Sequence, residues 1–443
     1  MKKMLLILVL ALFATFAFAE GQQEADNDFE PFTGTLTVMN NGIAPFPTGE
    51  FVWREEHGII EKVVADFAFL NPGVDVEMVY RDVSKGSLTF DTMLAAGNPP
   101  DIWLDASGYF ANLLNDDYAI RLEEYLDLSI YDETLLGMYT TTEGHVFAIP
   151  FMNVATGMAV NLTMLREAGM EMPAQKDWTT DTFLRGAAAL KRAGYPATMI
   201  MGSEGLNGWT CQWFYAFGAK FFEPGDWSKV AINSPEARDA LAYIKLLIDR
   251  GYTQPNVLSS DANTGVELFT TNKVFSCTLQ NGHTDPLFPV QLEKGKIDAI
   301  PDYTFVEFPH APGLDHAPVS GYQSIMSAHK SGDPAKDAMV AKLLGYINNY
   351  EAQYYYILCS GGFSTLKGLS PDSGMAAHPS YKAISNLAAT AGVYKQWPDG
   401  AAKNAARRPW ERLSEQWVRG KITADELLNR YEAEANAALE DLE

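Results

Sequence analysis

The sequence is poor in cysteine. Its three cysteines, Cys211, Cys277 and Cys359, stand far apart among 443 residues. They therefore provide neither the paired spacing of a zinc knuckle nor a disulfide framework. A single disulfide among them and isolated buried thiols are both compatible with the sequence. Stability must come mainly from packed apolar cores.

Long apolar runs are also missing, except at the amino terminus. Two lysines precede the apolar residues 4–12, and residues 17–19 form an A-x-A exit, which is the order of a cleavable secretory signal. The run is too short to cross a hydrocarbon core of about 30 Å comfortably. No cysteine follows it for lipid attachment. We therefore expect cleavage after Ala19 and a soluble protein secreted across the inner membrane into the periplasm.

Positive charge is scarce. Without the predicted signal peptide, 31 basic residues face 56 acidic ones, a formal charge of −25. Such a field repels nucleic acid and anionic membrane surfaces. It also keeps a secreted protein dispersed, and it does not identify a ligand.

The motifs of common enzyme classes are absent. The sequence has no HExxH, GxSxG, GxGxxG or P-loop pattern. The adjacent acidic pairs Glu55-Glu56 and Asp116-Asp117 point about 100° apart if helical, so neither pair faces one substrate. We predict no catalytic residue, no cofactor and no metal site. An exported carbohydrate-active enzyme is the main alternative, and it would need two carboxylates held across one bond.

Apolar patterns predict an α/β fold. After an acidic leader at residues 20–31, strands and helices alternate: a strand at 35–39, a helix at about 54–70, a strand at 74–80, a helix up to Gly97 and a buried strand at 101–104. Right-handed crossovers then give an open, mostly parallel sheet with helices on both faces.

Later segments repeat this alternation. Extended runs lie near residues 147–150, at 158–161 and at 304–308. Helix starts are marked by Thr180, Ser234-Pro235, Asp333-Pro334 and the Thr423/Glu426 capping-box spacing. The 424 residues after Ala19 exceed what one core usually supports, so two lobes are expected.

Several segments resemble one family. The sequence MLAAGNPPDIWLDA at residues 93–106 resembles the extracellular solute-binding proteins of ABC importers, in their sugar-binding branch. The same likeness occurs, in the family's order, at 59–80, 148–161, 273–283, 319–333 and 361–368.

The resemblance implies an architecture and a function. The amino-terminal lobe would comprise residues 32–148 and 308–362, and the other lobe residues 152–304 and 366–443. Crossing strands near 149–151 and 303–308, with a link near 361–364, would form a hinge. The lobes of a monomer would close on a mono- or oligosaccharide and present it to the permease subunits of an ABC importer. The protein would not be an enzyme.

Loops that follow strands are candidates for ligand contact, because ligands of open α/β sheets lie beyond the carboxyl ends of strands. Asn40 and Asn41 follow the first strand, Arg81 ends the second and Asp105 follows the third. Amide and carboxylate groups suit sugar hydroxyls. The alternative is that these side chains satisfy their own turns.

Aromatic side chains supply further candidates. Trp209 and Trp213 are four residues apart and would share a helix face, and an indole ring can stack on a sugar. For the neighbouring Phe214 and Phe217 we expect core packing instead. The remaining candidates come from other loops and segments: Asn281, His283, Gly321, Tyr322, Trp53 and Trp410.

A different ligand or output on the same fold is the second alternative, and it includes a periplasmic sensor that docks on a receptor. Peptides, polyamines, metal chelates or acidic solutes would require other side chains in the cleft. Anionic ligands call for arginine or a helix amino terminus. Among the candidate loops only Arg81 meets this requirement, so an acidic solute would depend on it.

Overall fold

The structure is a computed structural model. It describes residues 32–442 apart from 41–58, 81–87, 106–109, 111–112, 138, 142, 204, 207, 224–225, 281, 283, 286, 361–362, 370–376, 391–392, 395–396 and 398–399. The predicted signal peptide and leader lie outside the described residues. In the part of the chain that is described, no helix has both the length and the apolar character needed to span a membrane.

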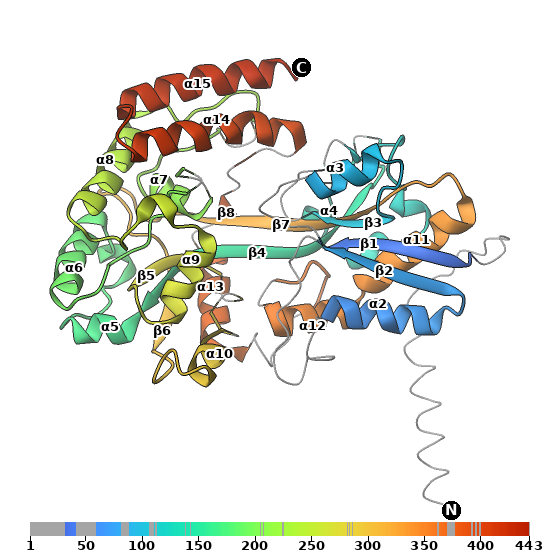
Figure 1. The fold of residues 1–443 in the computed structure, drawn as a ribbon, viewed down its shortest axis with the longest axis horizontal. Coiled ribbons are helices and arrows are strands. Elements are labelled where there is room, and N and C mark those ends of the chain that lie inside the picture. Colours follow the sequence, from blue (N-terminus) through green and yellow to red (C-terminus); the bar gives the residue numbers. More distant parts are fainter. Residues whose placement is uncertain are drawn as a thin grey trace, which may run out of the picture.

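The first three strands form a parallel sheet in one half of the molecule. β1 (Gly34–Asn40) lies between β2 (Val74–Tyr80) and β3 (Ile102–Asp105) and is parallel to both. The helices of this half are α2 (Ile59–Leu70), α3 (Leu88–Ala95), α4 (Glu133–Gly137), α11 (Pro334–Ile347) and α12 (Tyr350–Ser360), with short 3-10 turns at Leu122–Glu124 and Leu128–Ile130. We call this half the amino-terminal lobe (Figure 1).

Two long strands connect this lobe with the other half. β4 (Ala148–Asn161) and β7 (Val319–Ala328) are antiparallel neighbours and run from one half into the other (Figure 1). The sheet order is β2-β1-β3-β7-β4-β5. β6 (Tyr303–Val306) pairs with β4, and β8 (Val393–Tyr394) pairs with β7.

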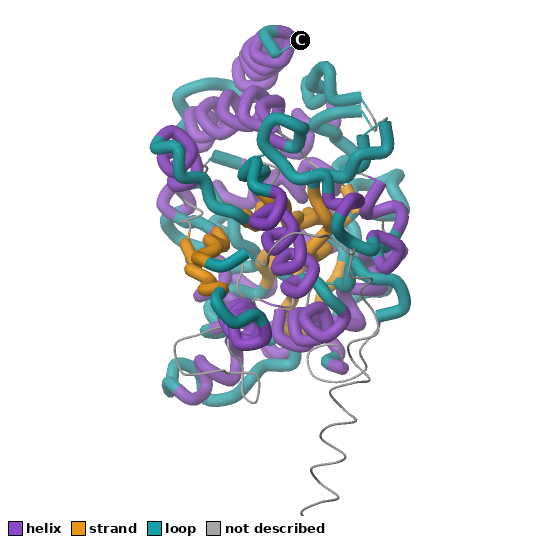
Figure 2. Tube along the Cα trace, turned by 90° about the vertical axis from the view of Figure 1, so that its right-hand side faces the viewer, coloured by secondary structure: helices purple, strands orange, loops and turns teal. Residues whose placement is uncertain are grey.

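The second half, the carboxy-terminal lobe, is mainly helical. Besides β5 (Ser276–Leu279) and β6 it contains α5 (Leu162–Glu167), α6 (Thr180–Arg192), α7 (Gln212–Ala216), α8 (Pro235–Asp249), α9 (Ala262–Thr270), α10 (Leu287–Glu293), α13 (Pro379–Thr390), α14 (Gly400–Val418) and α15 (Ala424–Glu440). Short 3-10 turns lie at Gln175–Asp177, Gly208–Cys211 and Val257–Ser259. Helices surround the strands when the molecule is viewed end on (Figure 2).

Local sequence signals account for many element boundaries. Ser234 caps α8, Asp333 caps α11, and Thr423 forms a capping box with Glu426 at the start of α15. Each cap satisfies backbone N–H groups that have no partner within the helix. The cap of α6 is Thr179, one residue before the predicted Thr180.

The tertiary arrangement differs from the sequence prediction at three points. The extended runs near 147–150 and 158–161 are parts of one strand, β4. The sheet is mixed, because β4 and β7 add antiparallel pairs to the parallel set around β1. The strand beside β4 in the connection between the lobes is β7, whereas β6 stays in the carboxy-terminal lobe.

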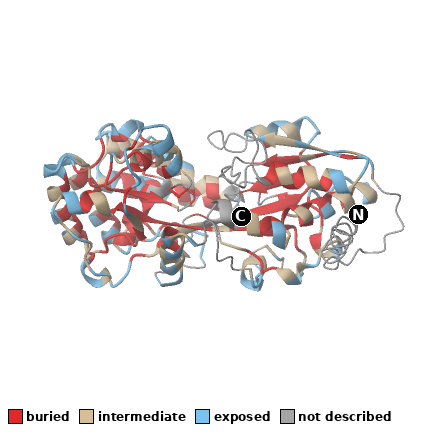
Figure 3. Ribbon diagram, turned by 90° about the horizontal axis from the view of Figure 1, so that it is seen from below, coloured by how far each residue is buried: buried red, intermediate tan, exposed pale blue. Residues whose placement is uncertain are grey.

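Each lobe has its own buried core (Figure 3). In the amino-terminal lobe, α2 buries the predicted stripe of Ile60, Val63, Val64 and Phe67 against the sheet. In the carboxy-terminal lobe, Trp410 is fully buried against Phe214, Phe221 and Tyr431, with ring centroids 4.8–5.3 Å apart. Its indole N–H donates to the Leu206 carbonyl over 2.9 Å.

This packing predicts the effect of Trp410→Ala. Removing a fully buried indole should lower the free energy of unfolding by about 3–5 kcal/mol, because large apolar contacts and a hydrogen bond are lost. Thermal and denaturant unfolding would measure the change. Phe69→Ala is the control, since Phe69 is 85% exposed and its loss should change stability little. Equal stability of the two variants would contradict the packing described here.

Candidate functional site

The carboxyl ends of β1 and β3 lie side by side at the end of the amino-terminal lobe where the connecting strands leave it. Met39 pairs with Trp103, so Asn40 and Asp105, which were predicted to follow their strands, are the last residues of neighbouring parallel strands. Met39 and Trp103 pack together in one apolar cluster, whereas Val38 belongs to the α2 side of the sheet. Strand alternation therefore directs Asn40 and Asp105 to opposite faces of the sheet.

Asn40 is buried with its hydrogen-bonding capacity unused. Its side chain is 1% exposed, and no described residue gives Nδ2 or Oδ1 a hydrogen-bond partner. Buried polar groups almost always have partners, so an amide with two open atoms needs an explanation. Its position at the end of β1 makes a bound polar ligand a direct explanation.

Glu61 lies on the same side of the sheet as Asn40, and the sequence interpretation missed it. Tyr80 pairs with Asn40 across β1 and β2, and its hydroxyl donates to Glu61 Oε1. Glu61 is 8% exposed, and its Oε2 has no hydrogen-bond partner among the described residues. The only signal in the sequence was a carboxylate in the first turn of α2, which is common for helix-dipole reasons alone.

Asp105 has a structural contact. It is fully buried, and its Oδ2 accepts the backbone N–H of Phe110 over 2.9 Å. Phe110 stacks on Phe90 in the apolar cluster that includes Trp103. Asp105 thus bonds to the backbone of its own chain segment, which agrees with the alternative that the sequence interpretation left open for such residues.

A second polar group lies where β4 and β7 run between the lobes. Thr156 Oγ1 is 2.6 Å from Ser320 Oγ, and Gln212 Nε2 of α7 donates to Thr156 Oγ1 over 3.3 Å. Gln212 is fully buried, and its Oε1 has no partner within the described part of the chain. Ser324 of β7 is also fully buried with an open hydroxyl. For Gln212, a polar side chain among apolar and aromatic neighbours was the available signal, whereas nothing in the sequence sets Ser324 apart from Ser320 and Gln323.

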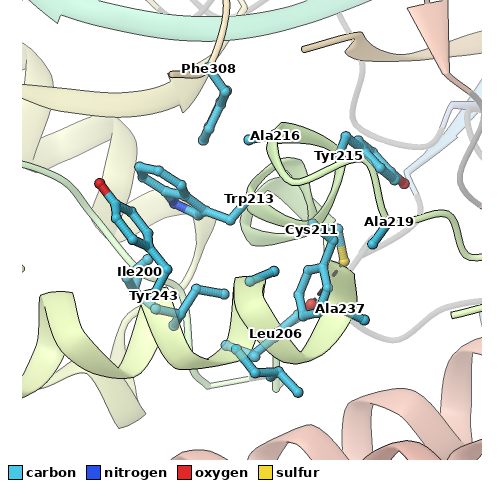
Figure 4. Close-up of a cluster of buried hydrophobic side chains, with 14 of the residues drawn as sticks. Ile200, Leu206, Cys211, Trp213, Tyr215, Ala216, Ala219, Ala237, Tyr243 and Phe308 are labelled. Carbon is cyan, nitrogen blue, oxygen red and sulfur yellow. Dashed lines mark hydrogen bonds between the residues drawn. The ribbon is translucent and has the colours of Figure 1, made fainter. Parts of the chain in front are cut away.

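The structure corrects the prediction for two tryptophans. Trp213 is 1% exposed and lies between Tyr243 and Phe308, with ring centroids 5.5 and 5.0 Å away (Figure 4). Trp410 is fully buried in the same core. Both rings are enclosed by their own lobe, so neither presents a face to a ligand. The aromatic stripe is a core stripe, as aromatic stripes usually are.

The remaining candidates are placed unevenly. Trp209 lies in the 3-10 turn before α7 rather than on one helix with Trp213, and its side chain is not described. Gly321 and Tyr322 lie within β7 and not in a loop, opposite Ala155 and Val154. Their strand position places them in the connection between the lobes. Five candidates lie outside the described residues: Asn41, Trp53, Arg81, Asn281 and His283.

A buried carboxylate, Asp285, lies in the sequence between β5 and α10. Asp285 accepts hydrogen bonds from Tyr303 over 2.5 Å, from Thr284 over 3.0 Å and from Ser380. Desolvation by burial raises the pKa of Asp285, and the hydrogen bonds from Ser380 and Tyr303 partly offset this. Asp285 thereby ties the loop after β5 to β6 and α13.

The neighbouring histidine does not form a nucleophile–base relay with this group. His378 Nδ1 lies 2.8 Å from Ser380 Oγ and 3.4 Å from Asp285 Oδ2. In a Ser-His-Asp triad the two ring nitrogens contact different partners, so that one can take a proton while the other is held. Here one nitrogen faces both groups. The described residues also contain no cluster of three or more metal-ligating side chains.

Comparison with known proteins identifies the family. Residues 54–354 match the family of bacterial extracellular solute-binding proteins. The chain belongs to this family. A protein of Brucella abortus (strain 2308) described as a binding protein is 26% identical over 223 residues, which are 48% of this chain and 52% of that protein. The match thus spans about half the length of this curated relative.

Solved structures of solute-binding proteins share the fold over almost the whole chain. The GacH receptor of Streptomyces glaucescens, studied without ligand and with acarbose, has a TM-score of 0.73 and 17% identity, covering 93% of this chain and 99% of its own. A chitin oligosaccharide binding protein has a TM-score of 0.73 and 19% identity, covering 92% and 99%. Maltose-bound MalE3 of T. maritima has a TM-score of 0.72 and 18% identity, covering 92% and 100%. The two-lobed solute-binding fold predicted from the sequence is confirmed.

The raised pKa of Asp285 predicts how Asp285→Asn changes the pH dependence of stability. Because burial raises this pKa above the ordinary value of about 3.9, the folded protein retains the proton to higher pH than the unfolded chain does. The stability from this group is present below about pH 4 and is lost as the pH rises through the folded pKa. The stability of wild type relative to Asp285→Asn should therefore fall as the pH is raised from about 4. Melting curves of both proteins across pH test this, and a constant difference would contradict it.

Proposed function

We propose that this solute-binding protein captures a carbohydrate between its two lobes and delivers it to an ABC importer. The observation that carries the proposal is Asn40, a buried amide with both hydrogen-bonding atoms open at the end of β1. A sugar hydroxyl donates and accepts, so it matches an amide that offers both a donor and an acceptor.

The open groups at the connecting strands have the same chemistry. Gln212 offers an amide oxygen and Ser324 a hydroxyl, and both are fully buried. Each hydrogen bond to a ligand contributes about 0.5–1.5 kcal/mol net. Several of them, with water expelled as the lobes close, reach micromolar affinity, about −8 kcal/mol.

Structural neighbours support a carbohydrate. Proteins of the same fold were solved with acarbose and maltose, and another is named for chitin oligosaccharides. Their identities of 17–19% transfer the fold and leave the ligand of this chain to experiment.

The proposal includes the location and the moving parts. The protein would be exported, cleaved after Ala19 and active as a periplasmic monomer without catalytic activity. Its predicted lobes are residues 32–148 with 308–362, and 152–304 with 366–443. Phe308 and Ala317 pack in the core of the carboxy-terminal lobe, so the chain would return to the amino-terminal lobe along β7 rather than at residue 308. The continuous strands β4 and β7 support this division, because they are the elements that would bend as the lobes close. Asn41, Trp53, Arg81, Trp209, Asn281, His283 and Tyr322 would complete the ligand site.

An amine-bearing solute is the second candidate, and one observation favours it. Glu61 Oε2 is a buried carboxylate oxygen with no partner among the residues described. An ammonium group would compensate such a charge better than a neutral hydroxyl does. Amino sugars and polyamines would meet this requirement.

A ligand screen tests the class of solute. The mature protein is heated with a panel of neutral mono- and oligosaccharides, amino sugars, polyamines and amino acids. At least one neutral saccharide should raise the melting temperature, because a ligand that binds only the native state stabilises it. The saccharide should be recovered uncleaved. Shifts with polyamines or amino acids alone would reject the carbohydrate, and turnover would favour an enzyme.

Two buried asparagines provide a matched test of the site. Asn40→Leu removes an amide that has no partner in the described part of the chain, so stability should not fall, while affinity for the saccharide from the screen weakens by more than about 1 kcal/mol. Asn161 is equally buried, but it accepts Met164 N over 3.0 Å and donates to Asn272 over 3.1 Å. Asn161→Leu should lower stability by about 1–3 kcal/mol and leave affinity unchanged.

Calorimetric titration and denaturant unfolding of both variants give the two readouts. Unchanged affinity in Asn40→Leu would remove Asn40 from the ligand site. A large loss of stability in that variant would show that its amide has a structural partner.

A further inference from the structure

Strand β4 contains an irregularity close to where it leaves the amino-terminal lobe. The ladder pairs Pro150 with Ile325 and Met152 with Ser324, so Phe151 is an extra residue on β4. A bulge of this kind bends the strand and increases its local twist. Beyond the bulge, β4 runs on beside β7 toward the carboxy-terminal lobe (Figure 1). The bend at Phe151 therefore sets the direction in which β4 crosses.

Three buried side chains hold the carbonyl groups of this bulge. Asn348 Nδ2 and Thr365 Oγ1 each donate to the Pro150 carbonyl over 2.8 Å. Gln353 Nε2 donates to the Phe151 carbonyl and to Asn348 Oδ1, each over 2.5 Å. All three side chains are at most 1% exposed. The bulge is thus fixed from the side chains of other elements and not by the strand ladder alone.

The three donors come from different parts of the chain. Asn348 is the carboxyl cap of α11, and Gln353 lies in α12. Thr365 lies in the segment 363–369, which also forms single bridges from Phe363 to Asn153 and from Leu366 to Tyr131. The helices of the amino-terminal lobe and a third strand-like segment therefore meet at one point on β4.

The conformation of the bulge depends on the side chains that donate to its carbonyl groups. A buried carbonyl that loses its donor costs about 1–3 kcal/mol. Water or another donor can restore the bond only if the bulge shifts, since the surrounding atoms are closely packed. Loss of a donor should consequently change the bend of β4, and with it the orientation of everything that β4 carries into the second lobe.

We infer that Asn348, Gln353 and Thr365 form a clamp that sets the resting angle between the two lobes. They are positioning residues, because they act through β4. The inference rests on the proposed function, since a resting angle matters only to a protein whose lobes close on a solute. The clamp would hold the ligand-free protein in one orientation, and ligand affinity would include the free energy needed to change it.

If the clamp residues had a purely structural role, replacing them would lower stability without changing the angle between the lobes. Gln254 provides a matched control for this case. Gln254 is 2% exposed, its Nε2 donates to the Ile200 carbonyl over 2.6 Å, and its Oε1 accepts the Ile200 N–H over 3.0 Å. It therefore holds a backbone segment as Gln353 does, but inside one lobe. Gln254→Met should lower stability and leave the angle between the lobes unchanged.

The test measures the distance between the lobes of the mature protein without ligand. Spin labels are placed at Phe69→Cys at the end of α2 and at Ala242→Cys on α8, both exposed positions in different lobes. Cys211 and Cys277 are buried, and Cys359→Ser is introduced in every variant. Electron–electron dipolar spectroscopy then gives the distance distribution for wild type, Gln353→Met, Thr365→Val, Thr365→Ser and Gln254→Met.

The clamp predicts that Gln353→Met and Thr365→Val shift or broaden the distance distribution. Thr365→Ser keeps the hydroxyl and should match wild type, as should Gln254→Met. Distributions of Gln353→Met and Thr365→Val that superimpose on wild type would overturn it. If Gln353→Met does not fold, Thr365→Val decides, because it removes one of two donors to one carbonyl. No ligand is involved, so failure of the saccharide screen with shifted distributions would reject the carbohydrate and keep the clamp.

Discussion

The constraint on which the structure depends is the continuity of β4 and β7 through both lobes. Each strand is covalently unbroken and hydrogen-bonded to the other, so the lobes cannot separate or slide freely. What remains is bending and twisting of the connecting strands, the kind of motion that hinge closure uses. The separate cores on either side keep each lobe rigid during such a motion. The two joined lobes therefore follow from how these strands are shared.

The distribution of buried polar groups complements this arrangement. In the interior of the carboxy-terminal lobe, aromatic rings such as Trp213 and Trp410 fill space, and the Trp410 N–H is bonded. Near the end of the amino-terminal lobe and beside the connecting strands, Asn40, Gln212 and Ser324 have polar atoms without a hydrogen-bond partner among the described residues. Open polar atoms inside a packed protein are costly. A ligand that binds beside the connecting strands would compensate the open atoms of these three side chains.

The sequence predicted what local chemistry determines. Alternation located β1 and β2, and side-chain caps located the starts of α8, α11 and α15, because these signals act within a few residues. It did not predict that the two runs around residues 147–161 form one strand, since continuity depends on partners from β7, β5 and β6. Nor could it separate core tryptophans from ligand-facing ones. An aromatic stripe has one spacing for both roles, and only the surrounding fold decides.

The roles of the buried asparagines, like those of the tryptophans, can be told apart only in the structure. Asn40 and Asn348 are both buried asparagines in the amino-terminal lobe. Asn348 has its amide bonded to Pro150 and Gln353, whereas neither polar atom of Asn40 has a partner among the described residues. A side chain that is fully bonded within the fold can position a strand, and one with open atoms can bind a solute. Residue type and burial are equal, so the number of partners is what separates the two roles.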